Sequence, residues 1–244
     1  MVFFICVWHI LSASGYVNRL LFPAPKEVLL AIIKWAQSGE LLSDLMTSYW
    51  RVLVGISVGG TIGISIGIAT GRMKLLNALV TPIIQIFRPL PPVAIIPLVI
   101  VWLGIGDLAK IFSIGFAVFF PIWINTHGAA EAIPQSYLRC AKLLTTSRWH
   151  RFNKVLIPAC LPSIISGVRT AIAVAFIMVY VSEIAGASNG LGYRISITHL
   201  SYQTDLMIGA LFVLAAAGAM ADLFFVGIMN RVFPWLVIYK TNND

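Results

Sequence analysis

The membrane topology of this chain is inferred from residues 128–162, which read GAAEAIPQSYLRCAKLLTTSRWHRFNKVLIPACLP. The segment contains five basic residues, namely Arg139, Lys142, Arg148, Arg151 and Lys154. A charged side chain at the centre of a bilayer costs about 2.5–3.5 kcal/mol, so this segment lies in water. Because cytoplasmic loops carry an excess of Lys and Arg, we expect it on the cytoplasmic side.

The composition around this segment is that of an integral membrane protein. Of the 244 residues, 59% are hydrophobic and 11% are charged, against roughly 45–50% apolar and about 25% charged in soluble domains. The formal net charge is +8. A nucleic-acid-binding protein gathers its basic residues on one polar domain, whereas here they stand at the ends of apolar segments, so we predict no nucleic-acid partner.

No catalytic or metal site is predicted. Cys6, Cys140 and Cys160 show neither CxxC nor His-paired spacing, which argues against a disulfide framework and a zinc site. The nucleotide-binding pattern GxxxxGK[ST] does not occur in the sequence. Any ATP used by this protein, with its magnesium, is therefore expected in a separate partner chain.

The first 50 residues predict one span and one surface helix. Residues 2–17 are apolar but fall short of the ~20 that a spanning helix needs. A cleaved signal peptide is the alternative, although no basic residue precedes the apolar run. From Lys26 to Gln37 apolar residues recur at helical spacing with charged residues between them, which predicts an interfacial helix on the outer leaflet.

The second predicted span, residues 52–71, has a glycine at every fourth position. These are Gly55, Gly59, Gly63, Gly67 and Gly71. The spacing places them on one face of a helix, where a second helix can approach closely. Arg72 and Lys74 follow and are predicted to anchor the cytoplasmic end.

The third predicted span, residues 78–104, is interrupted. Pro89, Pro91 and Pro92 remove three backbone donors within four positions, directly after Arg88. Broken backbone at membrane depth is tolerated only against protein or a water-filled cavity, and transporters build their pathways there. Arg88 is accordingly a candidate pathway residue, with snorkelling to the interface or internal pairing as the alternative.

Three further spans complete the predicted fold, at residues 109–127, 159–182 and 206–230. Arg169 lies inside the fifth span, Glu183 ends it, and Asp222 inside the sixth is expected to face protein. The chain is thus predicted to be a single all-α polytopic domain, residues 1–244, with about six spans, a cytoplasmic loop at 128–158 and both termini inside. Basic residues assigned to the external connections are Arg19, Lys26, Lys34, Arg51, Lys110 and Arg194.

The 128–158 loop resembles the EAA loop of binding-protein-dependent ABC importer permeases. Aligned on Pro158, its last element is Val155 to Pro158, Thr145 stands at the glycine position, and Arg139 to Ala141 take the E-A-A positions. Ala141 and Pro158 match by identity. The resemblance extends over most of the chain, through the stretches at 88–98 (RPLPPVAIIPL), 102–106 (WLGIG) and 190–192 (GLG).

This resemblance, closest to the branch for sulfonates, taurine and nitrate, implies a function. The chain would be a permease subunit of the inner membrane, translocating a small anion such as an aliphatic sulfonate or taurine. Its partners would be cytoplasmic ABC ATPases, an extracytoplasmic solute-binding protein and a second copy of the permease. Nitrate, bicarbonate or another small solute of the same family is the alternative substrate.

The resemblance also implies site residues. Those implied to dock on the ATPase are Tyr137, Ala141, Leu144, Thr145, Ser147, Arg148, Trp149 and Pro158. The alternative for this segment is a surface loop that its basic residues hold to anionic lipid. Candidates for the translocation pathway are Arg88, Pro89, Pro92, Arg169 and Glu183.

Two other classes of protein are less compatible with the sequence. An ion-coupled secondary transporter would need no ATPase and often shows two repeated halves, which this sequence does not show. A membrane enzyme would show an intramembrane constellation such as HExxH, which is not found.

Overall fold

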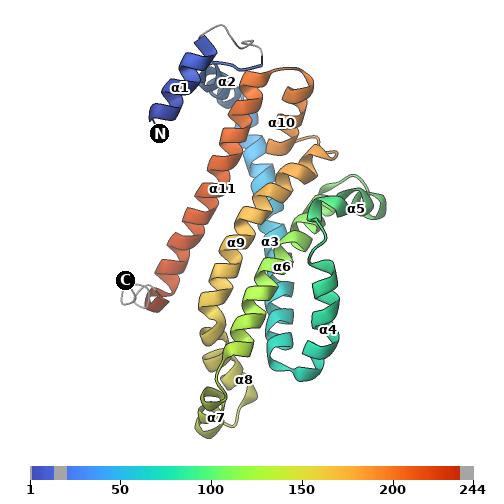
Figure 1. Cartoon of the computed structure of the whole chain (residues 1–244), viewed down its shortest axis with the longest axis vertical. Helices are drawn as coiled ribbons and strands as arrows, with labels where there is room; N and C mark the ends of the chain where they lie inside the picture. The colour runs from blue at the N-terminus through green and yellow to red at the C-terminus, as the bar shows by residue number, and fades with distance from the viewer. Residues whose placement is uncertain (1, 14–20, 237–244) are drawn as a thin grey trace.

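The computed structural model describes residues 2–13 and 21–236, and the regular structure in them is helical (Figure 1). The helices are α1 (Val2–Ala13), α2 (Pro25–Gln37), α3 (Glu40–Arg72), α4 (Lys74–Phe87), the 3-10 helix η1 (Pro92–Ile95), α5 (Ile96–Leu103), α6 (Asp107–Ala132), α7 (Gln135–Leu144), α8 (Arg148–Arg151), the π-helix η2 (Phe152–Leu156), α9 (Ile157–Ile184), α10 (Leu191–Leu200) and α11 (Thr204–Val232). The predicted all-α class is confirmed.

The molecule is elongated, and its two ends carry different elements. The helices α1, α2 and α10 lie at one end, and α7 and α8 lie at the other (Figure 1). We refer to these as the α2–α10 end and the α7–α8 end. Arg72 belongs to the latter, because its Nη1 donates to the carbonyl oxygen of Ala130 at 3.1 Å. The predicted basic anchor and the predicted cytoplasmic loop therefore share one end of the molecule.

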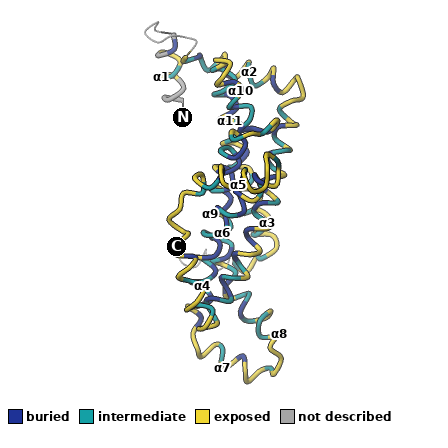
Figure 2. The backbone as a smooth tube through the Cα atoms, turned by 90° about the vertical axis from the view of Figure 1, so that its right-hand side faces the viewer, coloured by how far each residue is buried: buried dark blue, intermediate teal, exposed yellow. Residues whose placement is uncertain are grey.

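The core is formed by α3, α6 and α9, which pack along most of their lengths. Their facing side chains are fully buried, for example Ile114, Val118 and Ile122 on α6 with Ala171 and Ala175 on α9. Burial follows this central axis, and most residues of the outer helices α4 and α7 are exposed (Figure 2). Only Gly209, Ala210 and Ala217 are buried on α11, so that helix touches the core lightly.

The glycine face predicted on residues 52–71 is the contact between α3 and α6. A Cβ on Gly55 would lie 2.5 Å from Ile114 Cγ2, and one on Gly67 would lie 2.7 Å from Thr126 Cβ. Real Cβ atoms do not approach so closely, because van der Waals contact between carbons requires about 3.5–4.0 Å. The small residues therefore set the distance between the two helices.

Within residues 2–13 and 21–236, four helical segments are long and apolar enough to cross a bilayer: α3, α6, the continuous run Arg148–Ile184, and α11. A fifth crossing is formed if α4 and the η1–α5 segment are counted together, although they are bent by 86°. The predicted first span, 2–17, contains the 12-residue α1, about 18 Å long and shorter than a ~30 Å hydrocarbon core. Residues 14–17 of that span lie outside the described ranges.

The second span is longer than the sequence indicated. Its helix begins at Glu40, directly after Gly39 in the left-handed region at φ +78°, and not near residue 52. Helical turns continue through this polar stretch because Asp44, Ser48 and Arg51 recur on one face and are all buried against protein. Arg51, taken from sequence as an external residue, is part of the interior.

The break predicted at the proline cluster is present. Helix α4 ends at Phe87 and the helical path resumes at Pro92. Pro82 and Pro121, in contrast, lie inside α4 and α6 without ending them. Three prolines within four residues remove adjacent donors, whereas a single proline removes one, which explains the difference. The surface helix predicted at Lys26–Gln37 is also present, as α2, with Val28 and Trp35 buried.

Candidate functional site

The predicted coupling loop consists of two short helices, α7 and α8, at the tip of the molecule (Figure 1). Helix α7 buries Ala141, packs Leu138 partly against the apolar cluster beneath it, and exposes its remaining large apolar side chains. Tyr137 is 65% exposed, Leu143 88%, Leu144 86% and, on α8, Trp149 73%. Large apolar side chains this exposed beside five basic residues mark a contact surface, because an isolated water-facing loop gains nothing from them.

The turn between α7 and α8 is built by two hydroxyl side chains. Thr145 has φ −155° and ψ 138°, an extended conformation that any residue adopts. Its Oγ1 accepts from the N–H of Ser147 at 3.3 Å. The Oγ of Ser147 in turn accepts from the N–H of His150 at 3.3 Å and caps α8. Thr145 therefore replaces the glycine of the EAA pattern without strain.

The loop is joined to α9 by continuous helical backbone. Helix α8 passes into η2, a π-helical turn, and then into α9, where Pro158 lies in the first turn. Trp149 stacks on Phe152 with ring centroids 5.9 Å apart, while Arg148 is exposed. A small apolar cluster beneath the loop ties it to α3 and α6 through Ile68, Ala130, Ile133, Leu156, Cys160 and Ile164.

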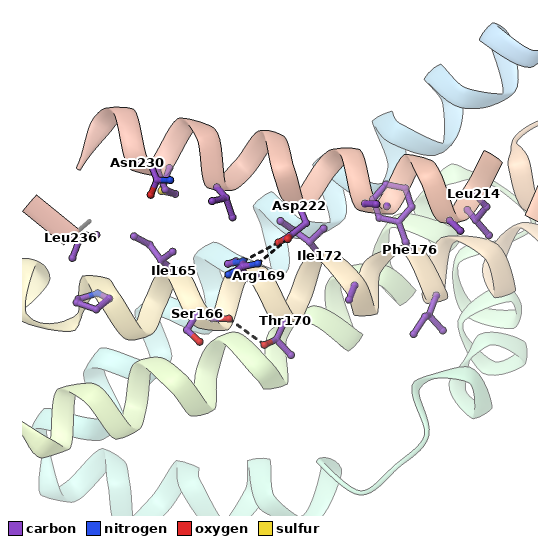
Figure 3. A pocket seen from close by; sticks show the side chains of 18 of the residues that line it. Ile165, Ser166, Arg169, Thr170, Ile172, Phe176, Leu214, Asp222, Asn230 and Leu236 are labelled. Carbon is purple, nitrogen blue, oxygen red and sulfur yellow. Dashed lines mark hydrogen bonds and ion pairs between the residues drawn. The ribbon is translucent and has the colours of Figure 1, made fainter. Parts of the chain in front are cut away.

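A groove of about 1760 Å³ lies between α9 and α11 (Figure 3). We call it the α9–α11 groove. It starts at Tyr137 and Pro158 at the α7–α8 end and reaches Tyr180 and Leu211 further along the two helices. Its lining is mostly apolar, with Ile165, Ile172, Phe176, Leu214 and Leu236 among the residues. Through Tyr137, the predicted coupling loop thus contributes to the same groove as the two spans.

Arg169 and Asp222 face each other across this groove (Figure 3). Arg169 Nε donates to Asp222 Oδ1 at 3.0 Å, and Nη2 donates to Oδ2 at 2.9 Å. The side chains remain 48% and 32% exposed. The expectation that Asp222 turns towards protein rather than lipid is met, because its partner is an arginine of the neighbouring helix.

Arg88 lies away from the groove. It directly follows α4 and is exposed, as is Pro89, while Pro92 is half-buried at the start of η1. Within residues 2–13 and 21–236, the Arg88 side chain makes no hydrogen bond or ion pair. The structure therefore separates Arg88, Pro89 and Pro92, at the α4–η1 break, from Arg169 in the α9–α11 groove.

Glu183, the fifth predicted pathway residue, is fully buried at the α2–α10 end. Its Oε1 accepts from Arg51 Nη1 at 2.7 Å and from Ser48 Oγ at 2.8 Å. Its Oε2 accepts from the backbone N–H of Gly192 at 2.8 Å. Glu183 therefore joins α3, α9 and the start of α10, and it does not line the groove.

The surroundings of Glu183 form a larger network, which we call the polar cluster: Asp44, Ser48, Arg51, Asp107, Glu183, Asn189 and Arg194. Arg194 Nη2 lies 2.9 Å from Asp44 Oδ2, and Arg51 Nη2 donates to Asn189 Oδ1 at 2.9 Å. Arg194 also lies over the ring of Trp35, 5.5 Å from its centroid. Sequence reasoning missed this cluster, although Asp44, Ser48 and Arg51 fall on one helical face and could have signalled it.

Across residues 2–13 and 21–236, no three His, Cys, Asp or Glu side chains are placed to hold a metal ion. Cys6 and Cys140 are exposed, Cys160 is buried, and all three are free thiols.

Comparison with known proteins identifies relatives over nearly the whole length. Residues 59–237 match the family described as binding-protein-dependent transport system inner membrane component. The chain is 30% identical over 237 residues to SsuC of Bacillus subtilis (strain 168), named as a permease protein of aliphatic sulfonates transport, covering 97% of this chain and 86% of that protein. The SsuC of Escherichia coli (strain K12), named in the same way, is 35% identical over 218 residues, 89% of this chain and 83% of that protein.

A third relative and two solved structures agree with this match. The taurine transport system permease protein TauC of Escherichia coli (strain K12) is 28% identical, over 94% of this chain and 85% of that protein. Among solved structures, the MetNI methionine ABC transporter in an inward-facing conformation has a TM-score of 0.62 at 20% identity, covering 82% of this chain and 97% of that chain. An amino acid ABC transporter with histidines also has a TM-score of 0.62, at 16% identity, over 83% and 96% of the two chains.

Proposed function

This chain belongs to the family of binding-protein-dependent transport system inner membrane components, and we propose that its substrate is an aliphatic sulfonate or taurine. Family membership makes it a permease subunit of an ABC importer, a transport component and not an enzyme. The relatives named for aliphatic sulfonates and taurine transport support the choice of substrate. Nitrate, bicarbonate or another small solute handled within the family is the alternative.

The observation that carries the proposed mechanism is the exposed apolar surface of the coupling loop. Leu143, Leu144 and Trp149 are each more than 70% exposed at the tip of the molecule, beside basic residues that keep this tip out of hydrocarbon. Covering an exposed leucine is worth about 1.5–3 kcal/mol. We propose that a cytoplasmic ABC ATPase, which binds ATP and magnesium, covers this surface.

The route from this surface into the membrane follows the backbone. The run from Arg148 to Ile184 is unbroken helix, with the π-helical turn Phe152–Leu156 near its start. A displacement of the loop by the ATPase therefore reaches α9 and, through Tyr137, the α9–α11 groove. In the proposed importer two permease copies move together, and both termini of each copy lie on the cytoplasmic side of the membrane. An extracytoplasmic solute-binding protein delivers the solute to the α2–α10 end.

We also propose that Arg88 lines the translocation pathway. It is exposed beside the backbone break, and a fixed positive charge lowers the cost of an anion passing through a low-dielectric region by about 4 kcal/mol at 4 Å and an effective dielectric of 20. Arg88→Gln should slow uptake per assembled complex, and Arg88→Lys should slow it less. If the Arg88→Gln complex takes up solute at the parental rate, Arg88 has no role in the pathway.

The docking surface is tested by Leu144→Asp, with Leu200→Asp as the matched control. Leu200 is 74% exposed but lies on α10 at the opposite end. Tagged permease is co-expressed with its ABC ATPase, and the ATPase that remains bound on purification is measured. We expect roughly ten- to hundred-fold weaker retention for Leu144→Asp, from the ~1.5–3 kcal/mol above, and parental retention for Leu200→Asp. Equal retention in both variants would refute docking at α7.

Substrate identity is tested by reconstitution. The permease–ATPase complex and its binding protein are placed in liposomes, and ATP-dependent uptake of taurine, ethanesulfonate, nitrate and bicarbonate is compared. We expect saturable uptake of a sulfonate. If only nitrate or bicarbonate is taken up, the protein is still an importer, but its substrate is not a sulfonate.

A further inference from the structure

The Arg169–Asp222 pair occupies an unusual place for two charged side chains. Arg169 stands between Ile157 and Ile184 on α9, and Asp222 between Thr204 and Val232 on α11, so both lie in the central turns of spans. We propose that this pair is an exchangeable anion site, at which a sulfonate displaces the Asp222 carboxylate from Arg169. The class of anion rests on the proposed function; the site itself rests on the geometry below.

The exposure of the pair argues against lipid as the occupant of the α9–α11 groove. Arg169 is 48% exposed and Asp222 32%, and charged groups in the centre of a bilayer face a bundle interior or a water-filled cavity. Lipid tails against these charges would be unfavourable. The groove is therefore expected to hold water and solute at the level of the pair.

The geometry of the pair matches the anion that we propose. Nε and Nη2 of Arg169 form two nearly parallel bonds of 3.0 and 2.9 Å to the two carboxylate oxygens of Asp222. A sulfonate presents oxygens to the same guanidinium fork, so Arg169 keeps two hydrogen bonds and an anionic partner in the exchange, and the released Asp222 carboxylate is left to the water of the groove. An uncharged solute cannot make this exchange.

The rest of the groove suits an organic anion with an apolar tail. Among the described residues that line the groove, Arg169 and Asp222 carry a charge, and Ser166, Thr170 and Asn230 are polar neighbours (Figure 3). Apolar side chains make up most of the remainder, and these would meet an alkyl chain. The Arg169–Asp222 pair is exposed and can exchange partners. The Arg51–Glu183 pair, in contrast, is buried and fully hydrogen-bonded and therefore cannot release either partner to a solute.

The site is tested by direct binding of trifluoromethanesulfonate to the purified permease–ATPase complex in nanodiscs. Binding is followed by broadening of the ¹⁹F signal, with uncharged trifluoroethanol as the control. We expect at least tenfold weaker binding in Arg169→Gln, and tighter binding in Asp222→Asn because the competing carboxylate is gone. Equal binding in the parental protein and Arg169→Gln, at equal ATPase content, overturns the proposal.

A charge swap separates this role from a merely structural ion pair. Arg169→Asp/Asp222→Arg keeps an ion pair between α9 and α11 but moves the guanidinium to the other helix. We expect it to recover the melting temperature lost in Arg169→Gln while leaving sulfonate binding at least fivefold weaker than in the parental complex. Recovery of both properties would make the pair a structural bridge and overturn the site.

The occupant of the groove is tested with Ser166→Cys in a background that replaces Cys6, Cys140 and Cys160 by alanine. We expect modification by the membrane-impermeant reagent sulfonatoethyl methanethiosulfonate, slowed by trifluoromethanesulfonate. Reaction only with lipid-soluble N-ethylmaleimide would show a lipid-filled groove, and disulfide formation between two copies would show that a second permease fills it; either result overturns the proposal.

These outcomes are independent of the proposed transport substrate. If the complex imports sulfonates and Arg169→Gln binds and imports them equally well, the anion site fails and the proposed function stands. If no sulfonate is imported but trifluoromethanesulfonate still binds through Arg169, the substrate assignment fails and the anion site stands.

Discussion

Arg51 Nη1 donates to Glu183 Oε1 across 2.7 Å and thereby joins α3 to α9, two helices whose paired residues lie 132 positions apart in the sequence. Arg51 is 3% exposed and Glu183 0%. A carboxylate removed from water in this way is tolerated only when its oxygens are hydrogen-bonded, and both oxygens of Glu183 are. The pair therefore fixes the α2–α10 end of the molecule, where α10 begins.

Glu183→Ala is expected to destabilise the protein severely. It leaves Arg51 buried without its main partner, and breaking a buried ion pair from one side costs about 3–5 kcal/mol. The change is measured as the fall in melting temperature of the purified complex. Glu40→Gln is the control, because Glu40 is 57% exposed and pairs only at the rim with Arg194; its expected effect is about 0–1 kcal/mol.

The double variant Arg51→Met/Glu183→Leu tests the same pair by removing both charged side chains at once. Removing both charges leaves neither partner as an unpaired buried ion, so the double variant should melt at a higher temperature than Glu183→Ala. A double variant less stable than either single replacement would mean that packing, and not the ion pair, holds this end together.

Gly59→Ala is expected to weaken the α3–α6 contact. A methyl group there would overlap the carbonyl oxygen and Cα of Gly115 on α6, and such overpacking costs about 1–3 kcal/mol. Gly128→Ala on α6 is the control, because nothing lies within 4 Å of its added Cβ and alanine favours a helix by up to about 1 kcal/mol. Folded yield and melting temperature should fall for Gly59→Ala and hold or rise for Gly128→Ala.

The features predicted correctly from sequence are those with a local cause. The all-α fold follows from composition, the α3–α6 contact follows from glycines at every fourth residue, and the bend after Phe87 follows from the prolines at 89, 91 and 92. Each depends on backbone rules that act within a few residues. Family patterns supplied the relation to sulfonate and taurine permeases.

The features missed are pairings between distant segments. Arg51, Lys110 and Arg194 were counted as external basic residues, yet Arg51 and Lys110 are buried and Arg194 is 17% exposed in ion pairs with Glu40 and Asp44. Arg19, counted with them, lies outside the described residues. A single sequence shows where the charged residues are but not which residues they pair with. It therefore cannot distinguish a basic residue that anchors a loop at the membrane surface from one that is ion-paired inside the protein. The same ambiguity placed Glu183 with the pathway candidates.

Thr145→Gly is expected to increase neither the stability of the protein nor its ATPase stimulation, although glycine is usual at this position of the EAA pattern. The backbone of Thr145 is extended, at φ −155°, and its Oγ1 binds the N–H of Ser147. Glycine would lose that hydrogen bond and add conformational freedom to the unfolded chain. Together these changes lower the free energy of unfolding by about 0.5–1.5 kcal/mol. ATPase stimulation by loaded binding protein should be unchanged or lower. A clear increase in stimulation would mean that the loop needs a left-handed residue here in its working state.

The orientation of the protein is tested by cysteine labelling at the two ends, in a background without the three native cysteines. Thr146 is exposed between α7 and α8, and Ser188 is exposed between α9 and α10. Ser188 is the better external position, because the neighbouring Asn189 accepts hydrogen bonds from Arg51 through both its side chain and its backbone oxygen. Replacing Asn189 would disturb the polar cluster that holds this end.

A membrane-impermeant maleimide added to intact cells should label Ser188→Cys and leave Thr146→Cys unlabelled until the cells are opened. The physical reason is the positive-inside rule: Arg72 and the five basic residues of the 128–162 segment lie at the α7–α8 end. Melting temperature of each cysteine variant provides the control for folding. Labelling of Thr146→Cys in intact cells would invert the topology and place the α7–α8 surface where a cytoplasmic ATPase could not reach it.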